Sequence, residues 1–519
     1  MSHWADSYAK QLNRKHPEKT TFVCASGITP SGKVHFGNFR EFITIEILAR
    51  ALRATGVSVR HIHIWDDFDA FRKIPPYVNA LYEEHLRKPL DGIPSPVTGY
   101  NSYAEAHEKP VEQILQGVGV HPEYIYQSAY YRQSTYAELI RVALQHRAQL
   151  REILNRYRTT DLPEDWWPIT VYSEFSEKDT TEIVEWDNKW GIVYRCDSSG
   201  TVYTIPDIRK TDRVKLLWRI DWPMRWSYFD VTAEASGKDH FSKGGSFESG
   251  GCISREVFDR DAPFGFQFDF VGIKGISGKM SSSEGMVVTL EDVLQVYQPE
   301  VIRYMFVRSR PNSEFVVSFD LDTLKIYEDY DRCARYAHRI DECSEERAEK
   351  ESCIWKYSQI DESTTKLPYS IPFRHLCNLL QIHDLNIQHL LDHLDIEADD
   401  SDFLVSRAQC AKHWLQKYAP PDFVFSLGSV DDVLPTLPPE IHSAVMAFAR
   451  ILEDEADGLV TKRYTELLHR ISADCEVPIK QLCVGLYQYL IGRDQGPRLA
   501  GFMELLGKEK ILTLLQRAE

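Results

Sequence analysis

The sequence predicts an α/β fold in which a doubly wound parallel sheet is interrupted by an insertion and followed by an all-helical domain. Residues 20–26 are short, apolar and rich in β-formers, and residues 57–65 alternate as a second strand. Between them, residues 39–55 repeat apolar side chains at helical spacing and stop at Gly56. Strand, helix and strand in this order form a βαβ unit, which is right-handed and places ligands at the carboxyl ends of its strands.

Two further patterns predict the rest of the architecture. Residues 184–205 contain short strand-like runs separated by Trp190-Gly191 and Ser199-Gly200, which is typical of a small antiparallel sheet. Residues 137–157 look helical, and so does most of the chain after Asp320, with charged or proline-rich breaks that include residues 344–366. The predicted domains are residues 1–95 and 216–288 for the two halves of the sheet, 96–215 for the insertion, 289–343 for a linking helical subdomain and 344–519 for the helical domain.

Composition predicts a large cytoplasmic protein. The chain has 519 residues, of which 43% are hydrophobic, and its ten cysteines are scattered, which argues against a disulfide framework. No apolar run is long enough to span a membrane, and the first residues lack an apolar signal core. The formal charge of −17 repels RNA, so any RNA contact must come from local basic patches.

The first functional motif is the run Pro30-Ser31-Gly32-Lys33-Val34-His35-Phe36-Gly37-Asn38. A glycine-rich loop that opens a helix offers unbonded backbone N–H groups and the positive end of the helix dipole, which suits phosphate. Gly32 and Gly37 allow close approach, and His35 and Asn38 can donate hydrogen bonds to phosphate oxygens. Taken alone, this motif is explained equally well as a loop that caps a helix.

The second motif is Gly278-Lys279-Met280-Ser281-Ser282-Ser283. Lys279 can neutralise a pyrophosphate leaving group, and the hydroxyls of Ser281, Ser282 and Ser283 can donate further hydrogen bonds. The two motifs together, in this order, predict an ATP site in which a carboxylate attacks the α-phosphate.

These motifs resemble the HIGH and KMSKS elements of the class I aminoacyl-tRNA synthetases. The resemblance extends over nearly the whole chain and is specifically to the class I lysyl-tRNA synthetases. It is carried by residues 25–41, 65–73, 218–226, 237–240 and 496–498. It implies a Rossmann-type catalytic domain, an inserted connective domain that binds the acceptor end of tRNA, and an all-α anticodon-binding domain.

The resemblance implies a monomeric lysine–tRNA ligase that uses ATP with Mg²⁺. The carboxylate of L-lysine attacks ATP to form lysyl-adenylate, and the 3′ end of tRNA(Lys) then accepts the lysyl group. Three alternatives remain: a synthetase for another amino acid such as glutamate, whose pocket should offer arginines; a free-standing nucleotidyltransferase; and a non-catalytic tRNA-binding paralogue.

The resemblance also assigns the ATP site. Ser282 stands where the KMSKS element usually has a second lysine, so transition-state charge must rest on Lys279, the hydroxyls, Mg²⁺ and either Lys274 or Lys238. The catalytic residues implied are His35, Asn38, Lys279, Ser281, Ser282 and Ser283. The ATP-binding residues implied are Pro30, Ser31, Gly32, His35, Gly37, Asn38, Gly237, Lys238, Asp239 and Lys279.

A lysine pocket needs an apolar wall for the side-chain stem and an electron-rich partner for the ammonium group. Trp218 and Phe268 can supply aromatic walls, where cation–π attraction is worth about 0.5–2 kcal/mol. Trp218 and Trp222 could alternatively pack in the core. Glu41 is the candidate partner for the ammonium, with a surface ion pair as the alternative. The lysine-binding residues implied are Gly27, Thr29, Glu41, Trp218, His240 and Phe268.

A cluster of acids follows the second strand. Asp66, Asp67 and Asp69 could serve lysine, ribose or a loop clamp with Arg72, or they could form a solvated turn. Relatives in the family often carry zinc-binding cysteines in the insertion. Because residues 169–202 retain only Cys196, we predict no structural zinc.

Two groups of arginines are candidates for tRNA contacts. Arg147, Arg151 and Arg158 recur at spacings that place them on one helix face, although such a face can also be merely solvated. Arg493 and Arg498 flank a Gly-Pro break in a part of the chain that resembles the anticodon-binding end of the family. Anticodon bases are read by stacking and by hydrogen bonds to their edges.

Overall fold

The structure, a computed structural model, describes residues 3–275, 287–394, 398–428 and 435–516. The chain folds into two compact units. Unit 1 comprises Met1–Leu294, Pro299–Val317 and Cys333–Thr365, and unit 2 comprises Gln295–Gln298, Ser318–Arg332 and Lys366–Glu519. None of the helices in these described residues is both long and apolar enough to cross a membrane.

Unit 1 is built on a parallel sheet of five strands in the order β10-β9-β1-β2-β3. The chain moves outward from β1 in one direction through β2 and β3, and in the other direction through β9 and β10. This order confirms the predicted doubly wound α/β fold. The order reverses between β1 and β9, and ligands bind at such a switch point, outside the carboxyl ends of the strands. The strands are β1 (Thr21–Ile28), β2 (Ser58–Trp65), β3 (Glu123–Tyr126), β9 (Ala233–Gly237) and β10 (Phe264–Phe268).

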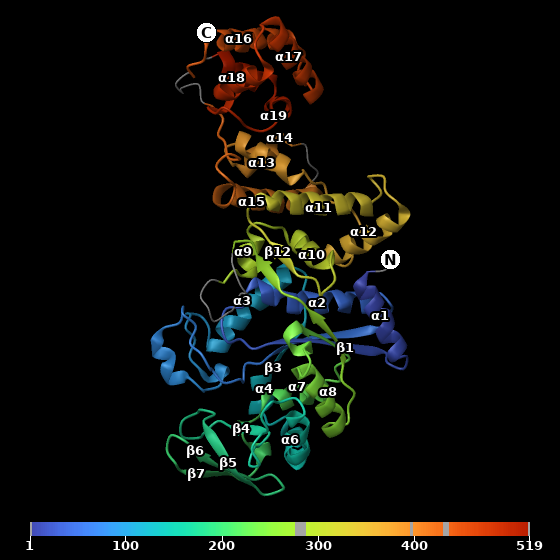
Figure 1. Ribbon diagram of the computed structural model, residues 1–519, viewed down its shortest axis with the longest axis vertical. Coiled ribbons are helices and arrows are strands. Elements are labelled where there is room, and N and C mark those ends of the chain that lie inside the picture. Colours follow the sequence, from blue (N-terminus) through green and yellow to red (C-terminus); the bar gives the residue numbers. More distant parts are fainter. Residues whose placement is uncertain (1–2, 276–286, 395–397, 429–434, 517–519) are drawn as a thin grey trace. The chain divides into compact units, whose positions relative to one another are not determined.

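Helices cover both faces of this sheet (Figure 1). Ile62 belongs to a core cluster that includes residues of α4–α8. The next residue, His63, points to the other face, where its ring lies 4.2 Å from that of Phe42 on α2. α2 packs against β1, β2 and β9, and α1 and α10 pack against α2. The helices of unit 1 are α1 (Trp4–Lys15), α2 (Phe36–Arg53), α3 (Tyr103–Gly117), α4 (Gln127–Arg132), α5 (Ala137–Gln145), α6 (Arg147–Asn155), α7 (Trp218–Tyr228), α8 (Ser246–Val257), α9 (Leu290–Leu294), α10 (Pro299–Val307) and α12 (Glu345–Ser358).

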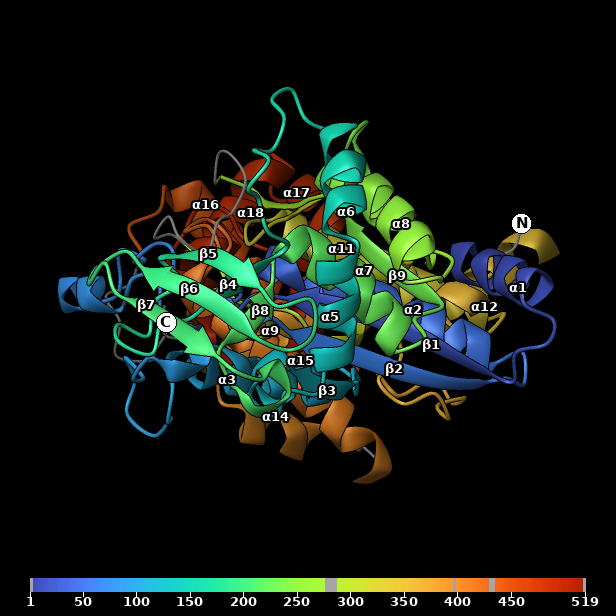
Figure 2. The same ribbon diagram turned by 90° about the horizontal axis from the view of Figure 1, so that it is seen from below.

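The predicted antiparallel excursion is present as a three-stranded sheet, β5-β6-β7, whose strands lie side by side in Figure 2. The single helix predicted over residues 137–157 is two helices, α5 and α6, which meet at His146. The remaining strands are β4 (Ile169–Val171), β5 (Thr181–Trp186), β6 (Ile192–Cys196), β7 (Val202–Ile205), β8 (Val214–Leu216), β11 (Val271–Ile273) and β12 (Phe315–Val317); β4 pairs with β8 and β11 with β12.

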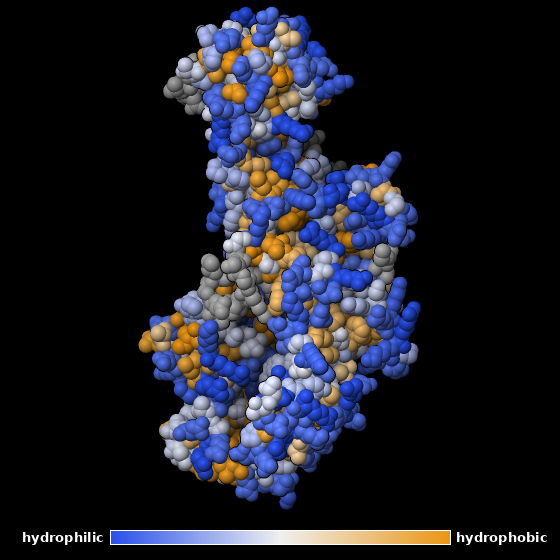
Figure 3. All heavy atoms as spheres, viewed as in Figure 1, coloured by the Kyte–Doolittle hydropathy of each residue, from blue (hydrophilic) through white to orange (hydrophobic). Residues whose placement is uncertain are grey.

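The prediction of a break over residues 344–366 is wrong, because α12 occupies much of this stretch. The Ser344 side chain caps the helix by accepting a hydrogen bond from the N–H of Arg347 at 3.3 Å. The charged residues form an outer face, which appears as hydrophilic surface in Figure 3, while Ile354 and Trp355 are buried. The helix has a narrow apolar stripe that the many charges obscure in the sequence.

Unit 2 is helical in its described residues, as predicted. One core cluster joins α16 to α20. Pro439 begins α16, and Gly492 ends α18 in the left-handed conformation with φ of 65°. The helices are α11 (Asp322–Ala337, whose last residues belong to unit 1), α13 (Phe373–Ile382), α14 (Ile387–His393), α15 (Ala398–Lys417), α16 (Pro439–Asp454), α17 (Thr461–Asp474), α18 (Ile479–Ile491), α19 (Leu499–Leu506) and α20 (Lys508–Leu515).

Candidate active site

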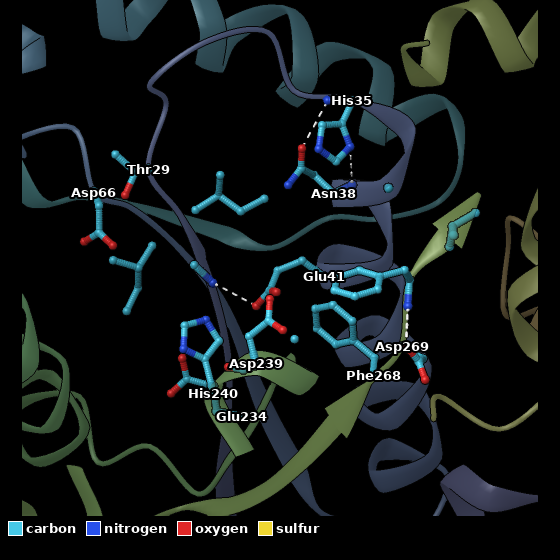
Figure 4. Close-up of a pocket in the computed structure, with 18 of the residues that line it drawn as sticks. Thr29, His35, Asn38, Glu41, Asp66, Glu234, Asp239, His240, Phe268 and Asp269 are labelled. Atoms are coloured by element: carbon cyan, nitrogen blue, oxygen red, sulfur yellow. Dashed lines mark hydrogen bonds between the residues drawn. The ribbon is translucent and has the colours of Figure 1, made fainter. Parts of the chain in front are cut away.

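A cavity of about 610 Å³ lies at the switch point of the sheet, where β1 and β9 end. Its lining draws on parts of the chain that are far apart in sequence, among them the start of α7. Figure 4 shows other parts of the lining: the residues that follow β1, the start of α2 and the residues that follow β9. Many of the predicted site residues therefore meet in one place. Those that line the cavity are Gly27, Thr29, His35, Gly37, Asn38, Glu41, Trp218, Gly237, Asp239, His240 and Phe268.

His35 and Asn38 form a capping box at the start of α2. The N–H of Asn38 donates to His35 Nδ1 at 3.2 Å, and the N–H of His35 donates to Asn38 Oδ1 at 3.1 Å. Because Nδ1 accepts a hydrogen bond, the neutral ring carries its proton on Nε2. The His35 ring and the Asn38 amide therefore lie beside the positive end of a helix.

The loop before this cap is held from outside the cavity. Pro30, Ser31 and Gly32 do not line the cavity. The hydroxyl of Tyr103 donates to the carbonyl oxygen of Ser31 at 3.0 Å, and the N–H of Lys33 donates to the Tyr77 hydroxyl at 2.6 Å. These contacts fix the path of the chain into α2.

The second motif lies outside the described residues, and this applies to Lys279, Ser281, Ser282 and Ser283. The residues that follow it are described. The N–H of Phe36, the first residue of α2, donates to the carbonyl oxygen of Val288 at 2.7 Å. The segment after the second motif is thus attached directly to the first motif.

Two carboxylates face the cavity from different elements. Glu41 lies on α2 and accepts a hydrogen bond from the N–H of Gly27 at 3.4 Å. Glu234 lies on β9, is 5% exposed, and accepts hydrogen bonds from the indole N–H groups of Trp222, at 2.9 Å, and Trp226. Within the described part of the chain, Glu41 forms no ion pair of the kind offered as its alternative role. Sequence reasoning missed Glu234, although an acid inside the otherwise small and apolar run of β9 is a signal that could have identified it.

Burial changes the acidity of both groups. Burial raises the pKa of Glu41 well above its ordinary value, and the nearby charge of Glu234 raises it further. Burial also raises the pKa of Glu234, against the opposing effect of the Trp222 hydrogen bond. Two like charges in a desolvated cavity favour protonation, and a cation bound beside them would favour ionisation of both acids.

Aromatic rings form the walls beside these carboxylates. The rings of Trp218 and Trp222 stack with their centres 5.8 Å apart and their planes 25° apart. The ring of His240 lies 5.8 Å from that of Trp218, and Phe268 lines the cavity at the end of β10. Trp222 is 7% exposed, so it serves the core as well as the cavity. Aromatic walls with two carboxylates suit a cation on a long apolar stem.

The acidic cluster after β2 is an ionic network and is not a solvated turn. Asp66 lines the cavity and pairs with Arg225, while Asp69 lies 2.9 Å from Lys215 Nζ. Asp67 accepts a hydrogen bond from the N–H of Ser128 at 2.7 Å. The network reaches the cavity through Asp66 and its partner.

The arginines predicted in the insertion hold a neighbouring loop. Arg147 donates to the carbonyl oxygens of Trp166, at 2.5 Å, and Glu164, at 2.9 Å, and its guanidinium stacks 3.8 Å from the centre of a Trp167 ring. Arg151 donates to Leu162 and Arg158 to Thr160, each to the carbonyl oxygen at 3.1 Å. All three arginines therefore contact residues 160–167 of their own chain.

Unit 2 has its own cavity, of about 860 Å³. Arg498 is exposed and lines this cavity together with Arg374, Asn378 and Phe423. Arg493 does not line it; its guanidinium donates to the carbonyl oxygen of Pro421 at 2.7 Å.

Among the described residues, no group of three His, Cys, Asp or Glu side chains is placed to hold a metal ion. Cys196 in the insertion is buried at the end of β6. Its sulfur lies 3.1 Å from the hydroxyl of Ser198 and 3.8 Å from that of Ser176.

Comparison with known proteins gives the family. The family model described as tRNA synthetases class I (K) matches residues 2–361. A lysine–tRNA ligase of Treponema pallidum is 44% identical over 99% of this chain and 98% of its own, and one of Pyrococcus furiosus is 37% identical over 99% of each. A solved glutamate tRNA ligase from Elizabethkingia meningosepticum is 12% identical with a TM-score of 0.44, over 96% of this chain and 99% of that one. The chain therefore belongs to the class I tRNA synthetases (K).

Proposed function

We propose that the protein is a lysine–tRNA ligase, which activates L-lysine with ATP and transfers it to the 3′ end of tRNA(Lys). The named relatives support this proposal. The observation that carries it is the pair Glu41 and Glu234 in an aromatic cavity beside the cap formed by His35 and Asn38. Class I synthetases use ATP, and Mg²⁺ accompanies its phosphates.

The cavity fits lysine better than glutamate. The aliphatic stem lies between the aromatic walls, and the ammonium group meets Glu41 and Glu234, whose raised pKa values fall again when a cation binds between them. Glutamate would bring a third carboxylate to this place. The arginine that lines the cavity, Arg225, is already paired with Asp66 and lies 3.4 Å from Asp221. Like charges without a free arginine select against glutamate.

Activation proceeds by in-line attack of the lysine carboxylate on the α-phosphate. A bond forms between a carboxylate oxygen and phosphorus, the bond to the bridging oxygen breaks, and pyrophosphate leaves with the electron pair. The Nε2–H of His35 and the Asn38 amide donate to the phosphate oxygens as their charge builds, aided by the dipole of α2. We assign the neutralisation of pyrophosphate to Lys279, with Ser281, Ser282 and Ser283 as further donors.

The nucleoside lies against the residues that follow β9, with Gly237 leaving room for it and Asp239 accepting a hydrogen bond from a ribose hydroxyl. In the second step a terminal hydroxyl of tRNA attacks the adenylate carbonyl, the bond between that carbonyl carbon and the phosphate oxygen breaks, and AMP leaves with the electron pair and takes up the hydroxyl proton. Positioning and charge stabilisation account for both steps without a covalent enzyme intermediate.

The cavity of unit 2 is our candidate for contact with unpaired tRNA bases. Phe423 offers a ring for stacking, Asn378 an amide for a base edge, and Arg498 a guanidinium for phosphate. Arg147, Arg151 and Arg158 remain candidates for contact with the acceptor end of tRNA. Their positive side chains could attract phosphate groups while they also bind residues 160–167.

Amino-acid-dependent exchange between ATP and pyrophosphate tests the function. The purified chain is expected to catalyse exchange with lysine in at least one of two conditions, with tRNA added or without it. It is not expected to catalyse exchange with glutamate or arginine. Lysylation of tRNA then separates a ligase from a free-standing nucleotidyltransferase. Absence of lysine-dependent exchange under both conditions would refute the proposal.

A further inference from the structure

A lysine residue lies at the edge of the cavity without lining it. Lys238 follows β9, and its Nζ lies 2.5 Å from Asp269 Oδ1 and 2.8 Å from Glu314 Oε1. Its ammonium also lies 4.5 Å from the centre of the Phe270 ring. Both acids line the cavity, and Lys238 does not. One cation therefore bridges two carboxylates that reach the cavity from the end of β10 and the start of β12.

These two carboxylates are held beside the beginning of α2. Arg40, two residues after Asn38, is buried and donates to the carbonyl oxygens of Phe270, at 3.2 Å, and Ser313, at 2.8 Å. Phe270 and Ser313 are the neighbours of Asp269 and Glu314 in sequence. The acids are thus attached to the helix whose first turn we assign to the phosphates of ATP. Arg40 supplies one positive charge near the two acids, and their remaining negative charge would repel that polyanion if Lys238 did not offset it.

We infer that Lys238 is a positioning residue, which promotes ATP binding by neutralising Asp269 and Glu314 and not by contacting the phosphates. The inference rests on the proposed function. Hydrogen bonds to Asp269 and Glu314 raise the pKa of Lys238. Burial opposes ionisation of Asp269, but its hydrogen bond to Lys238 prevails and lowers its pKa. Lys238 and Asp269 therefore remain charged at neutral pH.

The chain offers a matched control. Lys88 and Glu177 form an ion pair at 2.8 Å, the same separation as Lys238 and Glu314. The side-chain exposures of the two pairs are also alike, at 21% and 65% for Lys88 and Glu177 against 35% and 62% for Lys238 and Glu314. Neither Lys88 nor Glu177 lines the cavity.

The test is the KM for ATP and for lysine, with kcat, in lysine-dependent ATP–pyrophosphate exchange with tRNA present. Lys238→Ala is expected to raise the KM for ATP about fourfold, because each of the two partly exposed carboxylates that lose their counter-charge contributes about a factor of two. The kcat and the KM for lysine should stay unchanged, and high salt should shrink the effect. Lys238→Arg and Lys88→Ala should behave like the parent protein.

The deciding comparison removes the carboxylates as well. The variant Lys238→Ala/Asp269→Asn/Glu314→Gln is expected to recover the parent KM for ATP within about twofold, and Lys238→Ala/Glu314→Gln about half of the loss on a logarithmic scale. Thermal unfolding checks that each variant folds. If the triple variant does not fold, the recovery of KM in the double variant decides the comparison.

Three results would overturn the inference. A KM for ATP that stays high after the carboxylates are removed would mean that Lys238 contacts the phosphates itself. An unchanged KM in Lys238→Ala would mean that the neutralisation has no effect, and a loss confined to kcat would place Lys238 in the chemical step. All three presuppose lysine-dependent exchange by the parent protein, so failure of the proposed function is recognised separately.

Discussion

Glu41 on α2 and Glu234 on β9 line one cavity, and the charge of Glu234 raises the pKa of Glu41. Neither residue has a cation as its partner among the hydrogen bonds of the described chain: Glu41 accepts from the N–H of Gly27, and Glu234 accepts from two indoles. Arg225 lowers the pKa of Glu234 without fully offsetting the effect of burial, so a bound cation would favour ionisation of both acids. The proposed function assigns this pair to the ammonium group of lysine.

Replacing Glu41 by glutamine should remove most of the selectivity for a cation. We expect the KM for lysine to rise about 100-fold, corresponding to about 2.7 kcal/mol, which is typical of losing one partner of a desolvated charge pair. The KM for ATP should change little. Exchange kinetics with each substrate varied in turn provide the measurement, and a variant with an unaltered KM for lysine would exclude Glu41 as the ammonium partner.

Lysine affinity should increase with pH. Burial raises the pKa of Glu41. The ammonium group of lysine binds best when this carboxyl group is ionised, so the affinity for lysine rises as pH passes upward through the raised pKa. Binding should release protons, which calorimetry in buffers of different ionisation enthalpy detects. In Glu41→Gln the pH dependence should flatten, and an unchanged profile would assign it to another group.

The same substitution should stabilise the folded protein. Since the pKa of Glu41 is higher in the folded state than in the unfolded chain, folding takes up a proton, and stability falls as pH rises between the unfolded and folded values. Glu41→Gln removes this loss. Its melting temperature should exceed that of the parent at neutral pH and above, and match it in acid below about pH 4. Thermal unfolding across a pH series tests the sign, and a variant that melts lower at neutral pH would contradict it.

His35 has a capping role and a proposed catalytic role that one substitution can separate. Asparagine is a favoured N-cap residue, so His35→Asn should keep the cap on α2 and the melting temperature. It should nevertheless lose the Nε2–H donor and reduce kcat about 100-fold, with little change in the KM for lysine. Pre-steady-state adenylate formation is the direct measurement, and retention of full kcat would leave His35 as a cap alone.

Arg498 should affect tRNA and not the activation of lysine. With Arg498→Ala we expect the KM for tRNA to rise about five- to tenfold, with a weaker dependence on salt, because one phosphate contact is lost. Exchange at saturating tRNA should be unchanged. Arg470 is exposed, lies in the same unit and pairs with Asp474, so Arg470→Ala is a suitable control. Equal effects in both variants would indicate a general charge effect and not a specific contact.

Local patterns were sufficient to predict much of the fold. The strands now seen as Thr21–Ile28 and Ser58–Trp65, and the helix Phe36–Arg53 between them, were predicted within a few residues because burial imposes a period on each segment. The prediction failed over Glu345–Ser358, where charges obscure a narrow apolar stripe. It also joined α5 and α6, whose separation at His146 interrupts no hydrophobic pattern.

The sequence by itself determined the signature residues, the βαβ unit that carries them and the helical second half, since each depends on neighbours along the chain. Only the tertiary structure decided which acids share a cavity. Glu234 comes to Glu41 because β9 pairs with β1 after a long insertion, and the strand order is set by packing between distant segments. The same packing brings Asp269 and Glu314 into ion pairs with Lys238. These charged groups are close in space but distant in sequence, so no local repeat of residue types predicts that they meet.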